Sequence, residues 1–450
     1  MLEVRRLTAD ECIGAKKIST IVFNERHDYS GEEPRAPGEP RAPGESRAPG
    51  EPLESRDPRA PGEPFESRDP CDPRDLRDPH NPRDPLEFPY NWRWGVFDGG
   101  RIVSTLIEIP YVMRFDGHDA KMSGIGGVGT LPETRGGGNV RRMFEMLLAE
   151  AYSGGVVFSN LAPFSHAFYR KFGYELCSSR KTIRIPVKKL EQFKSDGEYT
   201  HILPGADTAD LKRIHSAYID DINHAIRRDV WPDDLAWRIF TSNDPYKTGC
   251  YVYSWRDNAG EPRGYMKIRH RYAADKRINE MDVEEIAFAG RDGLYAQLAL
   301  AGRMSAQIGD LVWRMPDFID PFDFADVAWD VEQRVEPREM TRVVNVKAAL
   351  EMMRRPDGEG CYIIEAEDPI IPENNGPWLV EYSREGSRVT ATPRGPDIVC
   401  DMPALAQLIT GYRTFDSLML SSRLRADVRA NEQTLRKVFT KRPQHVTEYF

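Results

Sequence analysis

The sequence has few cysteines, and their positions do not suggest a covalent or metal-bound framework. Six cysteines stand among 450 residues, at positions 12, 71, 177, 250, 361 and 400. They form no Cys-x-x-Cys pair, and no histidine stands near them at the spacing of a metal site. This scatter argues against a disulfide scaffold and a zinc site. We therefore predict no metal, and cysteines that are reduced and mostly packed inside the protein.

Long apolar runs are also missing. A helix that crosses a bilayer needs about 20 consecutive apolar residues, and no window of the sequence approaches that length. The opening segment, MLEVRRLTADECIGAKK, lacks the apolar stretch of a signal peptide. The formal net charge of −9 disfavours general nucleic-acid binding and suits a cationic small molecule. We expect a cytoplasmic protein with neither a membrane nor a nucleic acid as partner.

Between residues 30 and 89 the sequence has almost no aliphatic side chains. The pentapeptide RAPGE recurs four times there, and ESRDP recurs twice. Proline every few residues prevents a helix or a sheet ladder, so we predict a disordered or polyproline-like insert. It is either a spacer or SH3-like ligand, or a slipped repeat tolerated in a surface loop, and we place no site in it.

Strand and helix patterns alternate around this insert. A chain of 450 residues is expected to form two or three domains, because one domain usually has roughly 100–200 residues. Apolar spacing predicts a helix over 8–25, and Asp98-Gly99-Gly100 predicts a hairpin turn. The following elements are strands at 92–97, 102–110, 120–130, 156–161 and 174–185, with helices at 139–152 and 165–171. Together they predict an N-terminal domain over residues 1–186.

Two further domains are predicted, over 187–334 and 335–450. The first has helices near 208–223 and 290–308 and strands near 250–255 and 264–270. The second begins with the strand–helix pattern MTRVVNVKAALEMM and has helices near 402–410 and 430–439. Glu284 and Glu285 precede an apolar run, and we predict that they face solvent. Asp320, Asp323 and Asp326 lack the spacing of a calcium loop and are interpreted as a solvated connection.

A glycine-rich loop leads from a strand into a helix at GVGTLPETRGGGNVR, residues 127–141. A pyrophosphate is well held at such a place, because the first N–H groups of a helix are unpaired and its dipole attracts anions. Glycines let the backbone approach the ligand, and Arg135 and Arg141 add positive charge. A tight strand-to-helix turn needs glycine in any case, so the loop alone leaves both interpretations open.

RGGGNV resembles the acyl-CoA loop of GNAT acetyltransferases, [R/Q]-x-x-G-x-[G/A]. Arg135 and Gly138 match, whereas Val140 departs from the usual small residue. The later segment APFSHAFYRKFGY resembles the GNAT helix beside the CoA thiol, with its Y-x-x-x-G-[F/Y] ending. In that resemblance Tyr169 is the general acid that protonates the leaving thiolate. The alternative is a tyrosine that only packs over the sheet. His166, nearly one turn earlier, is a weaker candidate base.

The whole chain is similar to the Eis (enhanced intracellular survival) acetyltransferases. Three stretches carry the resemblance: GVGTLPETRGGGNVRRMF…APFSHAFYRKFGYE, EIAFAGRDGLYAQLALA, and MTRVVNVKAALE…PENNGPW…ALAQLITGYRTF…VTEYF. It implies an α+β fold of tandem GNAT-like domains with mixed central sheets and a C-terminal domain resembling sterol carrier protein. The middle copy lacks the glycine loop, so we expect it to shape the substrate cavity. The resemblance also implies a homohexamer.

The same resemblance assigns site residues. Acetyl-CoA, as co-substrate, is expected to contact Val128, Gly129, Thr130, Arg135, Gly136, Gly137, Gly138, Asn139, Val140, Arg141, Phe164 and Ser165. The α-carboxylate of Phe450 is the implied general base. An α-carboxyl has an ordinary pKa near 3.5, so it is ionised at neutral pH and able to accept a proton from the substrate. Without the resemblance, Phe450 is an ordinary frayed terminus.

We therefore predict an N-acetyltransferase that acts on amines of cationic small molecules, aminoglycoside-like or polyamine-like, or on lysine side chains. Transfer is expected to be direct, in a ternary complex. Two alternatives remain: an N-myristoyltransferase-like acyltransferase, which shares a duplicated GNAT layout and a C-terminal carboxylate, and a non-enzymatic lipid-binding scaffold.

Overall fold

The fold was established from a computed structural model, which describes residues 2–23, 92–231, 234–272, 278–323, 331–426 and 431–448. The predicted insert at 30–89, Cys71, Asp326 and Phe450 lie outside the described residues. None of the helices within these ranges has the length and apolar character needed to cross a membrane.

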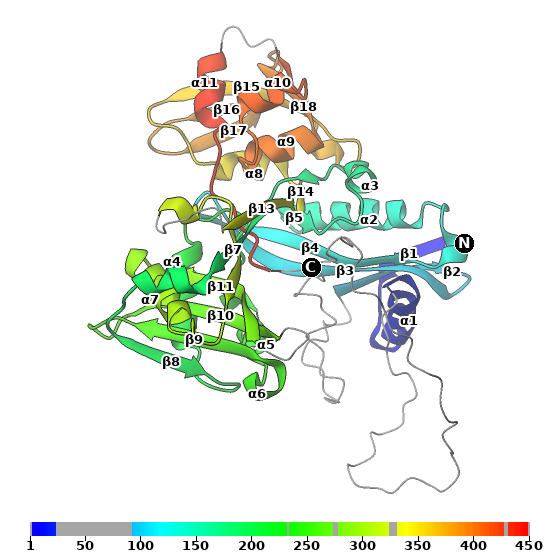
Figure 1. Ribbon diagram of the computed structural model, residues 1–450. Helices are drawn as coiled ribbons and strands as arrows, with labels where there is room; N and C mark the ends of the chain where they lie inside the picture. The colour runs from blue at the N-terminus through cyan, green and yellow to red at the C-terminus, as the bar shows by residue number, and fades with distance from the viewer. Residues whose placement is uncertain are drawn as a thin grey trace, which may run out of the picture.

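The first sheet has seven strands in the order β1-β2-β3-β4-β5-β14-β6. Its N-terminal part is an antiparallel meander that ends in the long strands β3 and β4, and β5 then pairs parallel to β4. Helices α1 and α2 cover opposite faces of this sheet (Figure 1). The bounds are β1 Leu2–Arg6, α1 Cys12–Phe23, β2 Arg93–Asp98, β3 Arg101–Phe115, β4 His118–Thr130, α2 Asn139–Ser153, β5 Phe158–Leu161, α3 His166–Arg170 and β6 Glu175–Leu176.

The second sheet repeats this plan, with seven strands in the order β13-β7-β12-β11-β10-β9-β8. It too has an antiparallel meander, which ends in β10 and β11. Helix α7 follows, and then β12, which pairs parallel to β11. The bounds are β7 Ser179–Pro186, β8 Glu198–Ile202, α4 Ala209–Ile219, α5 Leu235–Phe240, α6 Pro245–Thr248, β9 Cys250–Arg256, β10 Pro262–Tyr272, β11 Ile278–Phe288, α7 Arg291–Gly302, β12 Asp310–Pro316 and β13 Glu332–Pro337.

The third layer is a five-stranded sheet, β17-β16-β15-β18-β19, with helices α8 to α11 around it. The bounds are α8 Val346–Met352, β15 Gly360–Glu367, β16 Gly376–Tyr382, β17 Ser387–Ala391, β18 Ile398–Asp401, α9 Met402–Ile409, α10 Phe415–Leu420, β19 Arg425–Ala426 and α11 Glu432–Val438. Strand β14 of the first sheet, Met340–Val343, precedes them in the chain. The mixed α/β architecture agrees with the predicted fold class.

Strands cross the predicted domain boundaries. β7 precedes residue 187 yet pairs with β12 and β13 of the second sheet. β14 follows residue 335 yet inserts between β5 and β6 of the first sheet. Each seven-stranded sheet is therefore completed by a strand from another of the predicted segments.

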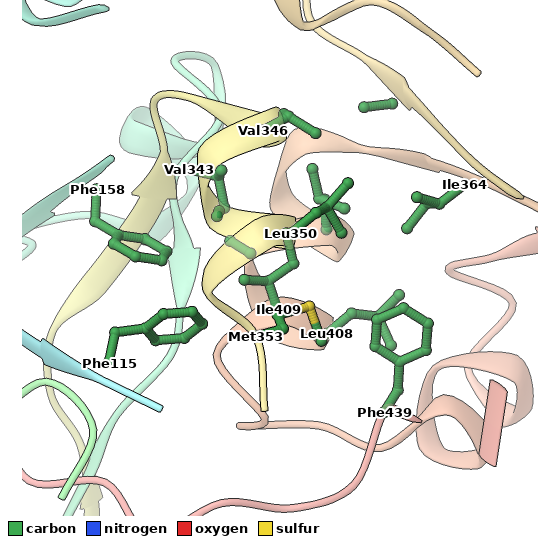
Figure 2. Close-up of a cluster of buried hydrophobic side chains, with 14 of the residues drawn as sticks. Phe115, Phe158, Val343, Val346, Leu350, Met353, Ile364, Leu408, Ile409 and Phe439 are labelled. Carbon is green, nitrogen blue, oxygen red and sulfur yellow. The ribbon is translucent and has the colours of Figure 1, made fainter. Parts of the chain in front are cut away.

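The first sheet and the C-terminal segment share one apolar core. Figure 2 shows Phe115 and Phe158 of the first sheet directed toward Leu350 and Met353 beside the C-terminal sheet, with Phe439 beyond. All five side chains are buried. The C-terminal layer is thus packed onto the sheet that carries the glycine loop.

Candidate active site

The glycine loop follows β4, a strand whose last residues are paired on one side only. β4 and β5 pair only from Met122 to Ile125, because β5 ends at Leu161 opposite Ile125. β4 itself continues to Thr130, paired on its other side with β3. Past Ile125, no described strand pairs with β4 on the β5 side. Such an edge offers N–H and C=O groups to an extended ligand, as the amides of a pantetheine arm require.

The loop after β4 is held in a shape that exposes the start of α2. Gly136 and Gly138 have φ of 82° and 75°, which favours glycine, and Gly138 is the N-cap without a side-chain cap. Asn139 Nδ2 donates to the Thr134 carbonyl at 3.3 Å, and Arg142 Nη1 donates to the Gly137 carbonyl at 2.7 Å. The first N–H groups of this helix remain available for an anion.

A pocket of about 820 Å³ opens at this loop. Its cationic rim consists of Arg135, Arg141 and Lys171, and its apolar wall includes Phe164 and Phe172. The lining residues are Val22, Val128, Thr130, Thr134, Arg135, Gly136, Gly138, Asn139, Val140, Arg141, Phe164, Phe168, Lys171 and Phe172. A cationic mouth on an apolar trough matches a ligand with phosphates at one end and an aliphatic arm.

Most of the predicted cofactor residues line this pocket, and three do not. Gly129 faces α1, where an added Cβ would meet Ile18 and Val22. Gly137 lies in the loop backbone, and the Ser165 hydroxyl accepts from the Phe168 N–H at 3.3 Å as the cap of α3. Whether any of them contacts a cofactor stays a prediction.

Sequence reasoning missed five lining residues: Val22, Thr134, Phe168, Lys171 and Phe172. Lys171 and Phe172 stand within the YRKFGY motif itself, so their proximity to Tyr169 was a usable signal. Val22 gave none, because α1 is brought to the pocket only by the folding of the sheet.

Tyr169 is not among the residues that line the pocket, but its ring packs against the lining residues Phe164 and Phe168. It is 3% exposed, and its ring centroid is 5.3 Å from that of Phe164 and 5.2 Å from that of Phe168. Burial raises its pKa above the ordinary value, and neighbouring Tyr174 raises it further, so the phenol stays protonated at neutral pH. No hydrogen bond to its hydroxyl occurs among the described residues. A protonated phenol is a competent proton donor.

The C-terminal segment returns to the junction of the first two sheets (Figure 1). Asn223 N–H donates to the Pro443 carbonyl at 3.1 Å, and Ile226 N–H donates to Thr447 Oγ1 at 3.1 Å. Glu448 accepts from Arg228 Nε at 2.5 Å. Phe450 follows two residues later, outside the described part of the chain, so its role as base stays a prediction.

The prediction that Glu284 and Glu285 face solvent is wrong. Glu285 accepts from Arg228 at 2.9 and 2.7 Å, and Glu284 lies 3.3 Å from Lys267 Nζ. The Glu285 side chain is 11% exposed and the Glu284 side chain is 9% exposed. Burial would raise the pKa of Glu285, but the Arg228 charge outweighs this and lowers it to about 2. The ion partners come from distant segments, which local hydropathy does not report.

The remaining candidate residues from the sequence are Asp320, Asp323 and His166. Asp320 lies 3.8 Å from Lys181 and is 43% exposed, and Asp323 is exposed. Nowhere in the described ranges do three or more metal-ligating side chains come together. His166 Nε2 is buried without a hydrogen-bond partner in the described structure.

The strand edge, the glycine loop and the cationic pocket have the arrangement that an acyltransferase site of the GNAT class requires. Residues 79–177 match the family model described as acetyltransferase (GNAT) domain, and residues 346–447 match the sterol carrier protein domain. The chain thus carries a GNAT domain and is an acetyltransferase, and the predicted fold class is confirmed. No protein among those of curated function matches the sequence.

Solved structures repeat the whole architecture. A GCN5-related N-acetyltransferase from Anabaena variabilis has a TM-score of 0.78 at 17% identity, and a probable N-acyltransferase from Enterococcus faecalis has 0.75 at 19%. Eis1 from Mycobacterium abscessus has 0.71 at 16%. In each comparison 100% of both chains is covered. At such identities the likeness establishes the fold.

Proposed function

We propose that the protein is an Eis-like N-acetyltransferase, which transfers the acetyl group of acetyl-CoA to an amine of a cationic small molecule, aminoglycoside-like or polyamine-like, or of a lysine side chain. The observation that carries this is one pocket in which a glycine loop, three cationic side chains and an apolar wall meet. The glycine loop and the cationic side chains suit the phosphates of acetyl-CoA, and the apolar wall suits its pantetheine arm.

The proposed reaction is direct. The Phe450 carboxylate takes a proton from the acceptor ammonium, and the amine nitrogen attacks the thioester carbonyl carbon. The C–S bond then breaks, and Tyr169 donates its proton to the sulfur, while the nitrogen loses its second proton, which restores the Tyr169 phenol. The products are an amide and CoA thiol. The free edge of β4 at Val128–Thr130 aligns the pantetheine, and the α2 N-terminus binds the diphosphate.

A cationic acceptor is supported by the net charge of −9 and is what the sequence resemblance to the Eis acetyltransferases implies. The homohexamer that the Eis resemblance implies, and action in the cytoplasm, belong to the same proposal.

The test begins with ligand-induced thermal shifts for acetyl-CoA, myristoyl-CoA and a lipid panel. The proposal expects the largest stabilisation with acetyl-CoA. A larger shift with myristoyl-CoA would favour an N-myristoyltransferase, and a shift with lipid alone would favour a binding scaffold.

The second test follows CoA thiol release with kanamycin or tobramycin as acceptor. It compares the wild-type chain with one extended by a few residues past Phe450, which removes the terminal carboxylate from its position. Activity that survives the extension in full would refute the assignment of the base.

A further inference from the structure

A buried ion pair links the C-terminal segment to the first sheet. Arg342 on β14 and Asp368, directly after β15, both have side chains that are 0% exposed. Arg342 Nη2 donates to the two Asp368 oxygens at 2.8 and 2.6 Å. Asp368 also accepts from Asn374 Nδ2 at 2.8 Å and from the Ile370 N–H at 2.9 Å. The carboxylate is thereby fixed from several sides.

The other guanidinium nitrogen contacts the segment that follows α3. Arg342 Nη1 donates to the Phe172 carbonyl at 2.6 Å. A Cβ added to Gly173 would lie 2.0 Å from this nitrogen, and Gly173 has a φ of 81°. Only glycine gives this turn its conformation and leaves room for Arg342.

This turn forms one side of the cofactor pocket. Lys171 and Phe172 line the pocket, and the Phe172 ring stacks on Phe144 with centroids 4.6 Å apart and an interplanar angle of 12°. The Phe172 N–H donates to the Tyr169 carbonyl at 2.9 Å. A shift of the Phe172 carbonyl would therefore move Lys171 of the cationic rim, Phe172 of the apolar wall and the segment of Tyr169 together.

Stability alone is a weak explanation for this pair. Two fully buried charges lose their hydration, and replacing such a pair by neutral groups is often neutral for folding or even stabilising. Burial would raise the pKa of Asp368, but Arg342 outweighs this and lowers it, so the pair is charged. What the guanidinium adds, beyond pairing with Asp368, is the fixed position of the Phe172 carbonyl.

We propose that Arg342 is a positioning residue for the cofactor site: it fixes the turn of Phe172 and Gly173 from the C-terminal segment and so sets the affinity for acetyl-CoA. The inference rests on the proposed function, because it takes this pocket as the acetyl-CoA site. It makes the sterol-carrier-like layer a support of the pocket wall.

The test is the double variant Arg342→Met/Asp368→Asn in the full chain, which removes both charges and leaves neither unpaired. We expect the Kd and KM for acetyl-CoA to rise about tenfold, since one fixed contact of the wall is lost. The KM for kanamycin should stay within about twofold, because the role proposed for this turn is confined to the cofactor pocket. Loss of folded protein alone would lower the total activity and leave the KM for acetyl-CoA and the KM for kanamycin unchanged.

The matched control is Ile364→Val, a core truncation in β15 of the same layer that leaves the turn untouched. It should lose thermal stability and keep the acetyl-CoA constants of the wild type. If the double variant binds acetyl-CoA as the wild type does, the inference is refuted and the proposed function stands. If the wild-type chain itself binds no acetyl-CoA, the proposed function fails first.

Discussion

Tyr169 is buried, protonated and without a hydrogen bond to its hydroxyl within the described structure, which makes its substitution informative. Tyr169→Phe is expected to lower kcat by about 10²-fold, the effect typical of losing a general acid, with little change in the KM for acetyl-CoA. Steady-state kinetics check this. Tyr174→Phe is the control: it loses the 2.7 Å hydrogen bond to Ser159 and hence some stability, but its kcat should persist. A Tyr169→Phe kcat within twofold of wild type would contradict the acid assignment.

His215 gives a pH-dependent prediction at the same scale. It is 3% exposed, its Nε2 has no hydrogen-bond partner in the described structure, and burial, assisted by Arg228, lowers its pKa to about 3. Between pH 6.5 and 3 the unfolded chain binds the extra proton, so stability rises with pH and is lost as pH falls below 6.5. The slope from this residue is at most about 1.4 kcal/mol per pH unit.

His215→Phe should therefore melt with a shallower pH dependence than the wild type between pH 7 and 5, measured by circular dichroism. The exposed His118→Phe serves as control and should keep the wild-type slope. Equal slopes for His215→Phe and the wild type would contradict the account.

At the scale of elements, the position of the glycine loop at the N-terminus of α2 predicts how a charge introduced there changes the affinity for acetyl-CoA. Gly138→Asp places a carboxylate where the diphosphate is expected, and Gly138→Asn places a neutral group of the same shape; both residue types tolerate a φ of 75°. The Kd for acetyl-CoA should rise at least about tenfold more for the aspartate variant. Calorimetric titration measures both. Equal affinities would show that no anion lies at this helix end.

Local patterns were sufficient for the elements that bear the site. The hairpin at Gly99, the glycine loop and α2 all appear where their turn residues and apolar spacing predicted them. The charged strand β1 and the short strand β14 were not anticipated as members of the first sheet. Pairing of β14 with β5 joins segments that are distant in sequence, and such a contact leaves no local periodicity. Arg342 and its role could not be found for the same reason.

At the scale of the whole molecule, the segments are completed by one another. β7 of the first segment joins the second sheet, and β14 of the third segment joins the first sheet. The shared core of Phe115, Phe158, Leu350 and Met353 leaves the C-terminal layer no independent boundary with the first sheet (Figure 2). This arrangement brings residues 441–448 back across the molecule to the junction of the first and second sheets.

Arg228 is the point at which that returning segment is fixed. Its side chain is 4% exposed and lies between Glu285 of β11 and Glu448 of the tail. Burial raises the pKa of Glu448, whereas Arg228 opposes this. Glu448→Gln weakens the hold on the tail yet leaves Arg228 paired with Glu285, so no charge is left alone in the interior.

We expect Glu448→Gln to lower kcat about tenfold with an unchanged KM for acetyl-CoA, because the tail carries the proposed base and the cofactor pocket lies elsewhere. The control is Glu432→Gln, which removes an exposed ion pair with Arg436 on α11. If both variants keep the wild-type kcat, the carboxylate at the chain end does not depend on the Arg228 contact. Opposite responses of Arg342→Met/Asp368→Asn and Glu448→Gln, one in cofactor affinity and one in turnover, would separate the two ways in which the C-terminal segment serves the site.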